Sequence, residues 1–532
     1  MSEPALKAVG PVTSALPPAL RALLTPAAYP HATANIGLRE THVSWVILTG
    51  PCAYKVKKPL KLDFIDASTL ERRRHLCEEE LRLNRRFAPE LYLDVVAVTA
   101  SGTGATIGGD GSVIDYAVRM RQFAAADELP SLLGRDAVHP QQMSALGELI
   151  ASLHLKAEIA PRQRAPERTE KLFQAVFGNL AQLLVHLSGA DASPRLNTLI
   201  DWSHDTAQAL EPVFRAREQA GFVRECHGDL HAANIVRLDD RLAPFDCIEF
   251  DPDLRWIDVV DDIAFLVMDL VSHERSDLAL TLLSRYLEVT GDYEGLSVLP
   301  FCAVYRALVR AKVDALTLET VPARADEFRQ RLQQRIRAAS QWTQREIPAL
   351  ILMHGASGSG KSWMSARLVP QLQAVRIRSD LERKRLAGLD AHRAAAAAVR
   401  EGIYSPEFSH RTYARLAECA EHCLNARLNT IVDASFLEPA DRTMFRSLAR
   451  RMGVPCYIVS CQADPLTLAQ RLEERSAART DPSDANLSVL DTQLREFAPF
   501  TAAEQGSVVA VDTSEPHAVA RVASEIKSRI AG

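Results

Sequence analysis

The chain has 532 residues, of which 47% are apolar and 24% are charged. This composition is typical of a globular protein and excludes a disordered or collagen-like one. The 62 basic and 67 acidic side chains give a formal net charge of −5, which excludes a broadly basic protein that coats nucleic acid. The length predicts about three or four compact domains.

The sequence favours a protein of the reducing cytoplasm with no membrane partner. Its most apolar candidate for a membrane segment, Ile263 to Val271, is short and interrupted by Asp269, whereas a membrane helix needs about 18 or more apolar residues. The N-terminus lacks a basic segment followed by an apolar core, so we expect no signal peptide. The nine cysteines are scattered and odd in number, which argues against a disulfide framework.

The first part of the chain is predicted to contain an arm and a small mixed domain. Residues 1–30 are rich in proline and alanine, and we expect a loosely attached arm or a short helix. Residues 31–122 then alternate between strand and helix patterns. These patterns predict two strands over 41–58, a charged helix over 70–87 and two further strands over 91–123.

Residues 123–345 are mainly helical in pattern, apart from a mixed segment over 223–250. The stretch 324–346 is predicted as a long amphipathic helix whose arginines lie on a solvated face. From Ile347 to the C-terminus, short apolar strands alternate with helices, which is typical of βα units around a parallel sheet. We therefore place a domain boundary near residue 346 and assign 346–532 to an α/β domain with a parallel sheet.

A phosphate-binding loop is predicted at the start of this C-terminal domain. The segment GASGSGKS, from Gly355 to Ser362, matches the pattern G-x-x-x-x-G-K-[ST] and lies between an apolar strand and a helix. Glycines let backbone N–H groups surround phosphates, and the helix N-terminus adds positive potential. Lys361 would contact the β- and γ-phosphates of ATP, and the Ser362 hydroxyl would bind Mg²⁺. The predicted P-loop nucleotide site consists of Gly355, Ser357, Gly358, Gly360, Lys361 and Ser362, and a bare glycine-rich turn is the alternative.

Further charged residues of the C-terminal domain follow its predicted strands. Asp380 and Arg383 follow the second strand, Asp433 ends the third, and arginines at positions 471, 475 and 479 lie late in the chain. Together with the loop, they resemble the small P-loop kinases of AAA type, which include gluconate kinase, polynucleotide 5′-kinase and the zeta-toxin group. The resemblance covers most of residues 348–515.

This resemblance implies roles for the charged residues. Asp380 would accept the proton of the attacking hydroxyl, Arg383 would hold the substrate, and Asp433 would lie on the metal side. Arg475 and Arg479 would close over the γ-phosphate. The alternatives are that Asp380 caps the N-terminus of a helix and that the arginines lie on a solvated helix face.

A second constellation of catalytic residue types lies before the C-terminal domain. The segment CHGDLHAANIV places His227, Asp229 and Asn234 in the spacing H-x-D-x-x-x-x-N, and Asp246 follows at the end of a strand-like segment. Kinase-fold enzymes need such a set of side chains. Asp229 would position and deprotonate the acceptor hydroxyl, whereas Asn234 and Asp246 would hold Mg²⁺ against the phosphates of ATP.

This constellation resembles the aminoglycoside phosphotransferase family, which shares the protein-kinase fold and includes choline and fructosamine kinases. The motif GDLHxxN with a following D-x-x-E, the helix WIDVVDDIAFL and the segment LIASLH carry the resemblance, which spans roughly residues 35–310. It implies an α+β kinase-like bilobal domain with an N-lobe over 31–122 and a C-lobe over 123–345. Within that domain, Asp258 and Asp262 would be structural.

The N-lobe of such a fold supplies a strand lysine and a helix glutamate. Lys55 and Lys57 share one face of the segment AYKVKKP, while CEEEL offers Glu79 and Glu80 on the following helix. We prefer Lys55 with Glu80. Five of the 11 lysines lie at or before residue 61, and a basic surface strand is the alternative for this cluster. The glycine-rich loop of the fold is missing, and residues 41–44 could take its place.

These observations predict an enzyme with two ATP sites, each of which transfers the γ-phosphoryl group of ATP, with Mg²⁺, to a hydroxyl group of a small molecule. Three alternatives stay open: a nucleotide-binding regulatory protein with little turnover, an aminoglycoside phosphotransferase, and a polynucleotide 5′-kinase in the C-terminal domain. The lack of stacking aromatic residues around 376–385 argues against nucleic acid as a partner. The sequence leaves both acceptors, the oligomeric state and any coupling of the sites open.

Overall fold

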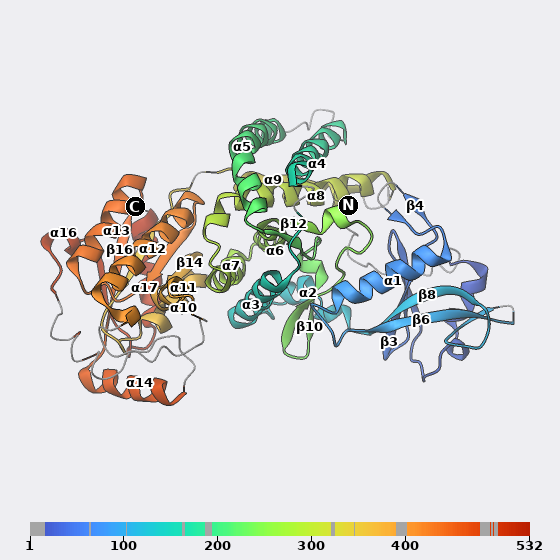
Figure 1. Cartoon of the computed structure of the whole chain (residues 1–532), viewed down its shortest axis with the longest axis horizontal. Helices are drawn as coiled ribbons and strands as arrows, with labels where there is room; N and C mark the ends of the chain where they lie inside the picture. The colour runs from blue at the N-terminus through green and yellow to red at the C-terminus, as the bar shows by residue number, and fades with distance from the viewer. Residues whose placement is uncertain are drawn as a thin grey trace. The chain divides into compact units, whose positions relative to one another are not determined.

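The computed structural model describes residues 16–62, 65–102, 104–161, 165–186, 194–320, 325–344, 346–389, 402–478, 490, 493 and 498–531. The chain forms two compact units, which are coloured along the sequence in Figure 1. The first unit comprises the chain up to Val138 together with Leu153–His273 and Phe301–Thr343. The second comprises His139–Ser152, Glu274–Pro300 and the chain from Gln344 onward. The second unit therefore includes two segments that precede the predicted boundary near residue 346.

A six-stranded antiparallel sheet forms the N-terminal part of the first unit, with the strand order β1-β2-β3-β8-β6-β7. The two strands predicted before the helix and the two predicted after it are all present, whereas β1 and β7 were not predicted. Both additional strands are four residues long and lie at the sheet edges, where the hydrophobic pattern is weakest. The strands are β1 (Gly37–Glu40), β2 (Ser44–Leu48), β3 (Cys52–Lys57), β6 (Tyr92–Ser101), β7 (Gly104–Ile107) and β8 (Val113–Arg121).

Helix α1 (Leu70–Asn84) packs against β8 and β6, as Figure 1 shows. It begins after Thr69, whose hydroxyl accepts a hydrogen bond from the N–H of Arg72 and so satisfies one free donor of the first turn. The short pair β4 (Lys61–Leu62) and β5 (Ile65–Asp66) precedes it. Within the described residues, α1 thus lies in the chain between the two predicted pairs of strands, as the sequence predicted.

The proline- and alanine-rich N-terminal stretch forms two short 3₁₀ helices over Pro18–Leu24 and Pro26–Ala28. Leu16, Leu20 and Leu23 are buried in one cluster with Trp45 and Tyr54 of the sheet. The stretch from residue 16 onward therefore agrees with the expected short helix and not with a loosely attached arm, because its leucines supply an apolar face that packs on the sheet.

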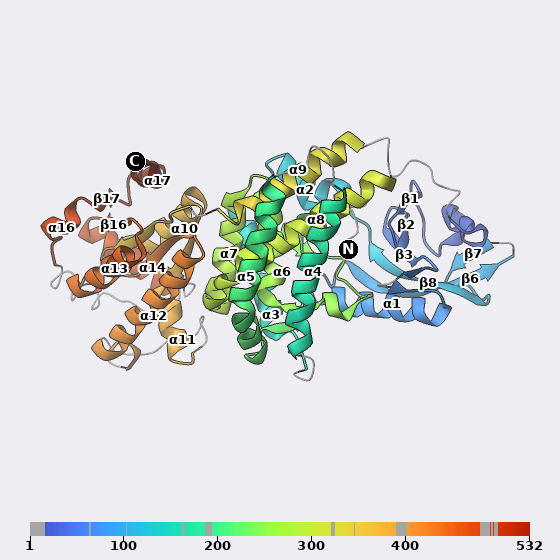
Figure 2. The same cartoon turned by 90° about the horizontal axis from the view of Figure 1, so that it is seen from above.

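The rest of the first unit is mainly helical. Helices α4 and α5 pack against each other, and α9 packs against α5 and α6 (Figure 2). Helices α3 and α8 contain residues of both units. The helices are α2 (Leu129–Gly134), α3 (Pro140–Lys156), α4 (Ala165–His186), α5 (Pro194–Gln219), α6 (Val259–Ser272), α8 (Leu299–Thr320) and α9 (Ala325–Gln341).

Two small antiparallel sheets frame the segments that carry the predicted catalytic residues. β10 (Ile235–Leu238) pairs with β11 (Arg241–Pro244), and β9 (Val223–Glu225) pairs with β12 (Trp256–Asp258). The motif CHGDLHAAN lies directly between β9 and β10, and Asp246 follows β11. The topology thus brings two loops that are about 20 residues apart in the chain to neighbouring positions, since His227 Nε2 and the carbonyl oxygen of Phe245 are 3.0 Å apart.

The arginine-rich helix α9 is present as predicted, but its arginines are not simply solvated. Arg331 pairs with Asp314 at 2.8 Å, and Arg335 pairs with the buried Asp269 at 2.7 Å. Leu332 and Ile336 on the same helix are buried. The sequence cannot show these ion pairs because their partners lie on other helices.

The second unit contains the predicted parallel sheet, which is confirmed with the strand order β14-β15-β13-β16-β17. Its strands are β13 (Leu350–His354), β14 (Ala374–Arg378), β15 (Asn429–Asp433), β16 (Cys456–Gln462) and β17 (Val508–Asp512). Its helices are α7 (Ser276–Thr290), α10 (Lys361–Leu372), α11 (Ser379–Leu386), α12 (Pro406–Asn425), α13 (Pro439–Met452), α14 (Pro465–Ala478), α16 (Ala502–Gln505) and α17 (Ala518–Ala531).

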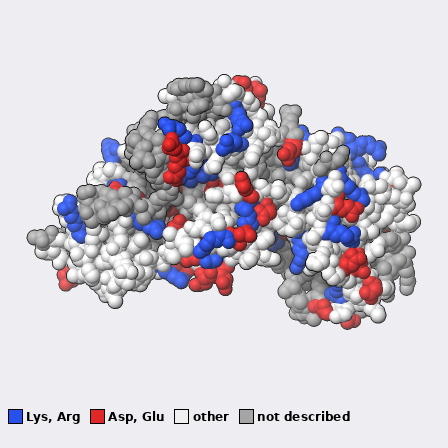
Figure 3. All heavy atoms as spheres, turned by 180° about the vertical axis from the view of Figure 1, so that it is seen from behind, with Lys and Arg blue, Asp and Glu red and all other residues white. Residues whose placement is uncertain are grey.

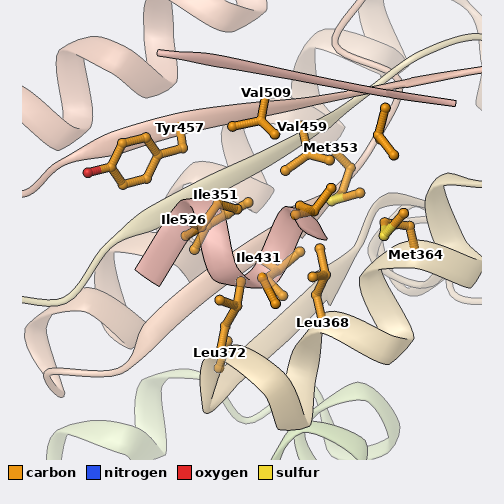
Figure 4. Packing of buried hydrophobic residues seen from close by; sticks show 14 of the residues in the cluster. Ile351, Met353, Met364, Leu368, Leu372, Ile431, Tyr457, Val459, Val509 and Ile526 are labelled. Carbon is orange, nitrogen blue, oxygen red and sulfur yellow. The ribbon is translucent and has the colours of Figure 1, made fainter. Parts of the chain in front are cut away.

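Apolar side chains of the central strands meet two helices to form the core of this unit. Figure 4 shows Ile351 and Val459 of the sheet in one cluster with Leu368 of α10 and Ile526 of α17. These strands are buried on both faces, which explains their nearly continuous apolar sequence.

Helix α7 packs against β14 and α10 within this unit. β14 lies at the edge of the sheet, and an uncovered edge exposes unpaired backbone groups. The hydroxyl of Ser284 on α7 accepts a hydrogen bond of 2.9 Å from the backbone N–H of Arg376 on β14. The helix therefore completes an edge that the sequence alone leaves open.

All nine cysteines are free thiols. In the part of the chain that the structure describes, none of the helices is long and apolar enough to cross a membrane.

Candidate functional site

The first candidate site is built around two lysines of β3 and one glutamate of α1. Lys55 Nζ lies 2.9 Å from Glu80 Oε1, and Lys57 Nζ lies 2.6 Å from Glu80 Oε2. Glu79 instead pairs with Arg82 at 2.9 Å. Both lysines thus meet the glutamate that the sequence analysis preferred, and the alternation of side chains along β3 places them on the same face.

The two lysines differ in their second partner. Lys55 Nζ lies 2.5 Å from Asp246 Oδ1, whereas Lys57 contacts Glu249. Burial alone would lower the pKa of Lys57, but the carboxylates of Glu249 and Glu80 outweigh it and raise the pKa above its usual range. Burial alone would raise the pKa of Asp246, but the neighbouring Lys55 outweighs it and lowers the pKa. Lys55 therefore lies beside the predicted metal ligand Asp246, whereas Lys57 is part of the protein interior.

Asp246 has a left-handed backbone conformation, with φ of +66°. This conformation is uncommon outside glycine, although aspartate and asparagine tolerate it better than most residues. The N–H of Asp246 donates a hydrogen bond of 3.0 Å to the hydroxyl of Tyr92, which holds the strained residue in place. Strained residues of this kind cluster at functional sites.

A pocket opens next to Lys55 and Asp246 in the first unit. Most of its lining is apolar, and only a few groups are charged, a combination typical of small-molecule sites. Gln122 fixes the adjoining turn because its side-chain oxygen accepts hydrogen bonds of 2.9 Å from the N–H groups of Thr49 and Gly50. The pocket is lined by Arg39, Val46, Leu48, Ala53, Lys55, Tyr92, Met120, Gln122, Phe123, Phe245 and Asp246.

The predicted catalytic aspartate and asparagine contact each other directly. Asn234 Nδ2 donates hydrogen bonds to the carbonyl oxygen of Asp229 at 3.0 Å and to its Oδ2 at 2.9 Å. Gly228 has φ of +85°, and a Cβ atom there would lie 2.7 Å from the carbonyl oxygen of Leu254. Only glycine fits this position. The loop geometry thus brings Asp229 and Asn234 together, and their catalytic and metal-binding roles stay predictions.

Asp262 of α6 holds the loop that carries Asp229 and Asn234 by hydrogen bonds. Its carboxylate accepts hydrogen bonds from the N–H groups of His227 at 3.0 Å and Gly228 at 2.8 Å, and His154 Nε2 lies 3.1 Å away. Burial raises the pKa of Asp262, but these contacts with His154 and His227 outweigh it and lower the pKa to about 2. Asp258, the other carboxylate of the motif, caps the N-terminus of α6 and pairs with Arg217 at 2.8 Å.

His154, Cys226 and Asp262 also have their potential ligand atoms within 4.8 Å of one another. Burial raises the pKa of the Cys226 thiol well above its usual range, so the thiol stays protonated, whereas a metal needs the thiolate. The hydrogen bonds that Asp262 accepts from the backbone also occupy its oxygens. We interpret this cluster as a support of the loop and not as a metal centre.

The sequence analysis missed two residues next to Asp229. His231 Nε2 lies 3.3 Å from Asp229 Oδ2, and Arg310 Nη1 of α8 lies 3.2 Å from the same His231 nitrogen. Arg306, one turn earlier on α8, is fully paired with Asp261 at 2.8 Å. Burial lowers the pKa of Arg310, although the carboxylates of Asp269, Asp229 and Asp314 act in the opposite direction. No motif contains Arg310, so only the fold could reveal it.

The second candidate site is the loop between β13 and α10. Gly355 has φ of +141°, and a Cβ atom there would lie 2.5 Å from the carbonyl oxygen of Cys461. Gly360 has φ of +85° at the N-cap of α10, where the free N–H groups of the helix begin. Lys361 Nζ donates hydrogen bonds of 2.8 Å to the carbonyl oxygens of Gly355 and Ala356. This lysine therefore lies over the loop, where it can meet a bound phosphate.

Residues from later segments of the unit form hydrogen bonds with the P-loop. Thr513 Oγ1 donates a hydrogen bond of 2.9 Å to the carbonyl oxygen of Ser359, and Arg471 Nη1 donates one of 2.8 Å to Thr513 Oγ1. The side-chain oxygen of Gln493 accepts a hydrogen bond of 2.7 Å from the N–H of Ser357. Of the three late arginines, Arg471 thus contacts the loop region. The side chain of Arg475, which lies in α14, and all of Arg479 are outside the described residues, so their lid role stays a prediction.

Asp433 lies at the carboxyl end of β15, next to β13, where the predicted P-loop begins. It is buried, and its Oδ2 accepts a hydrogen bond of 3.0 Å from the hydroxyl of Ser365 on α10. Ser362 lies one turn earlier on that helix. A serine hydroxyl and a carboxylate are oxygen ligands of the kind that Mg²⁺ prefers. This donor set fits the metal that the sequence predicted.

Asp380 lies in the first turn of α11, after β14. Arg378 occupies the N-cap position, so Asp380 is not the cap that the alternative interpretation required. Arg383 Nη1 donates hydrogen bonds to the carbonyl oxygen of Ile403 at 2.7 Å and to Ser409 Oγ at 3.2 Å. Arg383 therefore anchors neighbouring elements, and contact with a substrate stays a prediction for it.

Comparison with known families supports the second site. Residues 350–500 match the family model AAA_33, described as an AAA domain. The C-terminal part of this chain is a P-loop domain. The match covers the described P-loop, Lys361, Ser362 and Asp433.

The chain is also similar to curated proteins and to solved structures. Uncharacterized proteins of Mycobacterium tuberculosis and Mycobacterium bovis are each 29% identical to the chain over 454 residues, which is 84% of this chain and 87% of each relative. A gluconokinase from Sinorhizobium meliloti is 22% identical, with a TM-score of 0.25, and the match covers 35% of this chain and 99% of that chain. The APS kinase CysC of Mycobacterium tuberculosis, solved with AMPPNP and APS, is 16% identical, with a TM-score of 0.25 and coverage of 35% and 100%.

Proposed function

We propose that the P-loop domain transfers the γ-phosphoryl group of ATP to a hydroxyl group of a small molecule. The observation that carries this proposal is the placement of Lys361, Ser362 and Asp433 at the carboxyl edge of a parallel sheet, where phosphate ligands of such folds bind. Bound Mg²⁺ would neutralise the phosphate oxygens. Lys361 would hold the β- and γ-phosphates, and the backbone N–H groups of the loop would surround them.

Asp380 supports a kinase rather than a simple ATPase. It follows β14, whose carboxyl end lies on the same sheet edge as the P-loop, because β13, β14 and β15 are parallel. A carboxylate at this edge can position an acceptor hydroxyl and accept its proton. The P-loop domain would thus exclude water as the acceptor by presenting an organic hydroxyl in its place.

For the first unit we propose a second ATP site of the aminoglycoside phosphotransferase type. Lys55, paired with Glu80, would bind the phosphates of ATP, and Asp246 with Asn234 would hold Mg²⁺. The apolar lining of the adjacent pocket suits an adenine ring. Asp229 would accept the proton of the acceptor hydroxyl. Residues 41–44, which begin in the turn between β1 and β2, would take the place of a glycine-rich loop, and the hydroxyl of Thr41 closes this turn by accepting a hydrogen bond of 2.8 Å from the N–H of Ser44.

Arg310 bears on the choice of acceptor for this first site. Its guanidinium contacts His231, which lies 3.3 Å from Asp229, and the carboxylates of Asp269, Asp229 and Asp314 attract it. Arg310 would attract an acceptor that carries a carboxylate or phosphate group, whereas these carboxylates would attract a polycation such as an aminoglycoside. The charges therefore leave both an anionic hydroxyl compound and an aminoglycoside as acceptors for this site.

The charge distribution bears on the nucleic-acid alternative for the P-loop domain. Over the face shown in Figure 3, basic and acidic side chains are interspersed rather than separated into a basic track. Binding of a polynucleotide depends mainly on clustered positive charge. The face shown therefore favours a small-molecule acceptor over a polynucleotide for this domain.

The experiment uses γ-labelled ATP, Mg²⁺ and a fractionated extract of small metabolites. Label is followed into low-molecular-weight products with the wild-type chain, Asp229→Ala and Lys361→Ala. Asp239→Ala and Lys527→Ala serve as controls, since both residues are exposed in the same two units. Loss of a product in one active-site variant assigns its acceptor to that site. Confirmed ATP binding without transfer in any fraction would contradict the kinase proposal and favour a regulatory nucleotide-binding protein.

A further inference from the structure

A buried ion pair connects helix α7 to the edge strand of the P-loop domain. Glu288 of α7 is 2% exposed, and its Oε1 accepts a hydrogen bond of 2.7 Å from Arg376 Nε on β14. Its other oxygen, Oε2, lies 3.0 Å from Arg285. Both carboxylate oxygens of Glu288 are thus occupied by guanidinium groups within the second unit.

Arg376 extends this connection to the proposed metal ligands. Its Nη1 donates hydrogen bonds of 3.3 Å to the carbonyl oxygen of Ser362 and to the hydroxyl of Ser365. Ser365 in turn donates a hydrogen bond of 3.0 Å to Asp433. One guanidinium group therefore touches the residue that carries the proposed metal-binding hydroxyl and the serine that orients the proposed metal-binding carboxylate.

The charges explain why Glu288 is needed. Arg376 is a largely buried cation, and it and Asp433 attract each other electrostatically. Without a second carboxylate, the guanidinium would turn toward Asp433 and compete with a cation bound there. Burial raises the pKa of Glu288, but Arg376 and Arg378 outweigh it and lower the pKa. Glu288 thus stays ionised at neutral pH, and its hydrogen bond to Nε of Arg376 would keep this guanidinium from turning toward Asp433.

We propose that Glu288 and Arg376 are positioning residues for the metal ligands Ser362 and Asp433 of the P-loop site. The inference rests on the proposed function of the P-loop domain and deepens it. Groups that hydrogen-bond to metal ligands fix their orientation, and their loss typically lowers metal affinity by about 10–100-fold. Glu288 lies more than 60 residues before the P-loop in the sequence, so the nucleotide site depends on a helix outside the segment matched by the AAA family.

The test measures binding of ADP to the full chain by calorimetry, once with Mg²⁺ and once with EDTA. Lys361→Ala first identifies which part of the ADP binding belongs to the P-loop. We expect Glu288→Gln to weaken binding of Mg²⁺ and ADP together by at least about tenfold, with less than about a twofold change for metal-free ADP. Arg376→Lys, which keeps the charge but cannot contact Glu288 and Ser365 at once, should show the same selective loss.

The matched control is Glu504→Gln, which removes a carboxylate that is equally buried in the same unit and paired with Arg442 at 2.8 Å. It should leave the ratio of the two affinities unchanged. An equal loss of affinity with and without Mg²⁺, or no loss for either Glu288→Gln or Arg376→Lys, would overturn the positioning role while leaving the nucleotide site intact. Failure of the wild-type P-loop to bind ADP, seen as no effect of Lys361→Ala, would overturn the proposed function and this inference together.

Discussion

Replacement of Lys57 by methionine should destabilise the first unit far more than the same replacement of Lys55. Lys57 is fully buried, and its ammonium group lies between the carboxylates of Glu80 and Glu249. In Lys57→Met, Glu80 keeps Lys55 at 2.9 Å, but Glu249 loses its cation. Removal of one partner of a buried ion pair costs about 3–5 kcal/mol, and we expect a loss in this range.

In Lys55→Met, by contrast, Glu80 keeps Lys57 at 2.6 Å, and the affected carboxylate is Asp246 at the edge of a pocket. Water can reach that carboxylate, so the expected loss of stability is smaller. The functional consequence is reversed, because Lys55 is the proposed phosphate contact. Lys55→Met should therefore lose nucleotide binding at the first site while keeping most of its stability.

Hydrogen exchange measured by mass spectrometry on peptides that cover β2 and β3 reports the free energy of local opening for each variant. The exchange rates should also show a pH dependence in Lys57→Met. Burial already raises the pKa of Glu249. A carboxyl group whose pKa is raised in the folded state contributes stability at low pH, and this contribution is lost as the pH rises through that pKa. The defect of Lys57→Met should therefore shrink as the pH is lowered toward the pKa of Glu249.

The double variant Lys57→Met with Glu249→Gln provides the control. It removes the orphaned charge together with its partner, and it should recover part of the loss. Opening free energies that differ by less than about 1 kcal/mol between Lys57→Met and wild type, or no recovery in the double variant, would refute the assignment of Lys57 to the interior and Lys55 to the site.

Three further outcomes are expected. Ile351→Ala, in the core of the parallel sheet, should lower the unfolding free energy of the second unit by about 2–5 kcal/mol in a urea titration, and a loss below about 1 kcal/mol would contradict the packing shown in Figure 4. Burial and Glu438 raise the pKa of Asp441 to about 6, so this residue contributes stability that is lost as the pH rises from 4 to 7, and the difference in melting temperature between wild type and Asp441→Asn should shrink over this range. Gly355→Ala should abolish nucleotide binding by the P-loop because its Cβ would meet a backbone carbonyl, whereas Gly506→Ala, which has open space, should bind normally in the same calorimetric assay.

Much of the P-loop domain could be predicted from sequence because its signals are local. The loop from Gly355 to Ser362 is continuous in the chain, and the five strands are short apolar segments that end in recognisable polar residues. The spacing of Asp229 and Asn234 is likewise local, since a single loop between β9 and β10 brings the two side chains together. Short-range patterns of this kind survive in a sequence without knowledge of the fold.

The choice between Lys55 and Lys57 could not be made with the same patterns. The two side chains point to the same face of β3, and strand alternation treats them alike. Only the packing of β3 against a loop more than 180 residues later in the chain separates them, since one lysine meets Asp246 and the other meets Glu249. Single charged residues on helices, such as Arg310 and Glu288, belong to no sequence motif that could have identified them.

The sequence by itself therefore determined most of the order of strands and helices, the phosphate-binding loop and the residue types of the two proposed sites. The tertiary structure decided which charges face each other, which arginines anchor the fold, and that α7 covers the edge of the parallel sheet and reaches the P-loop through Arg376. The reason is physical: hydrogen-bond patterns and hydrophobic periodicity act over a few residues, whereas the energy of a buried charge depends on partners that only the folded chain brings near.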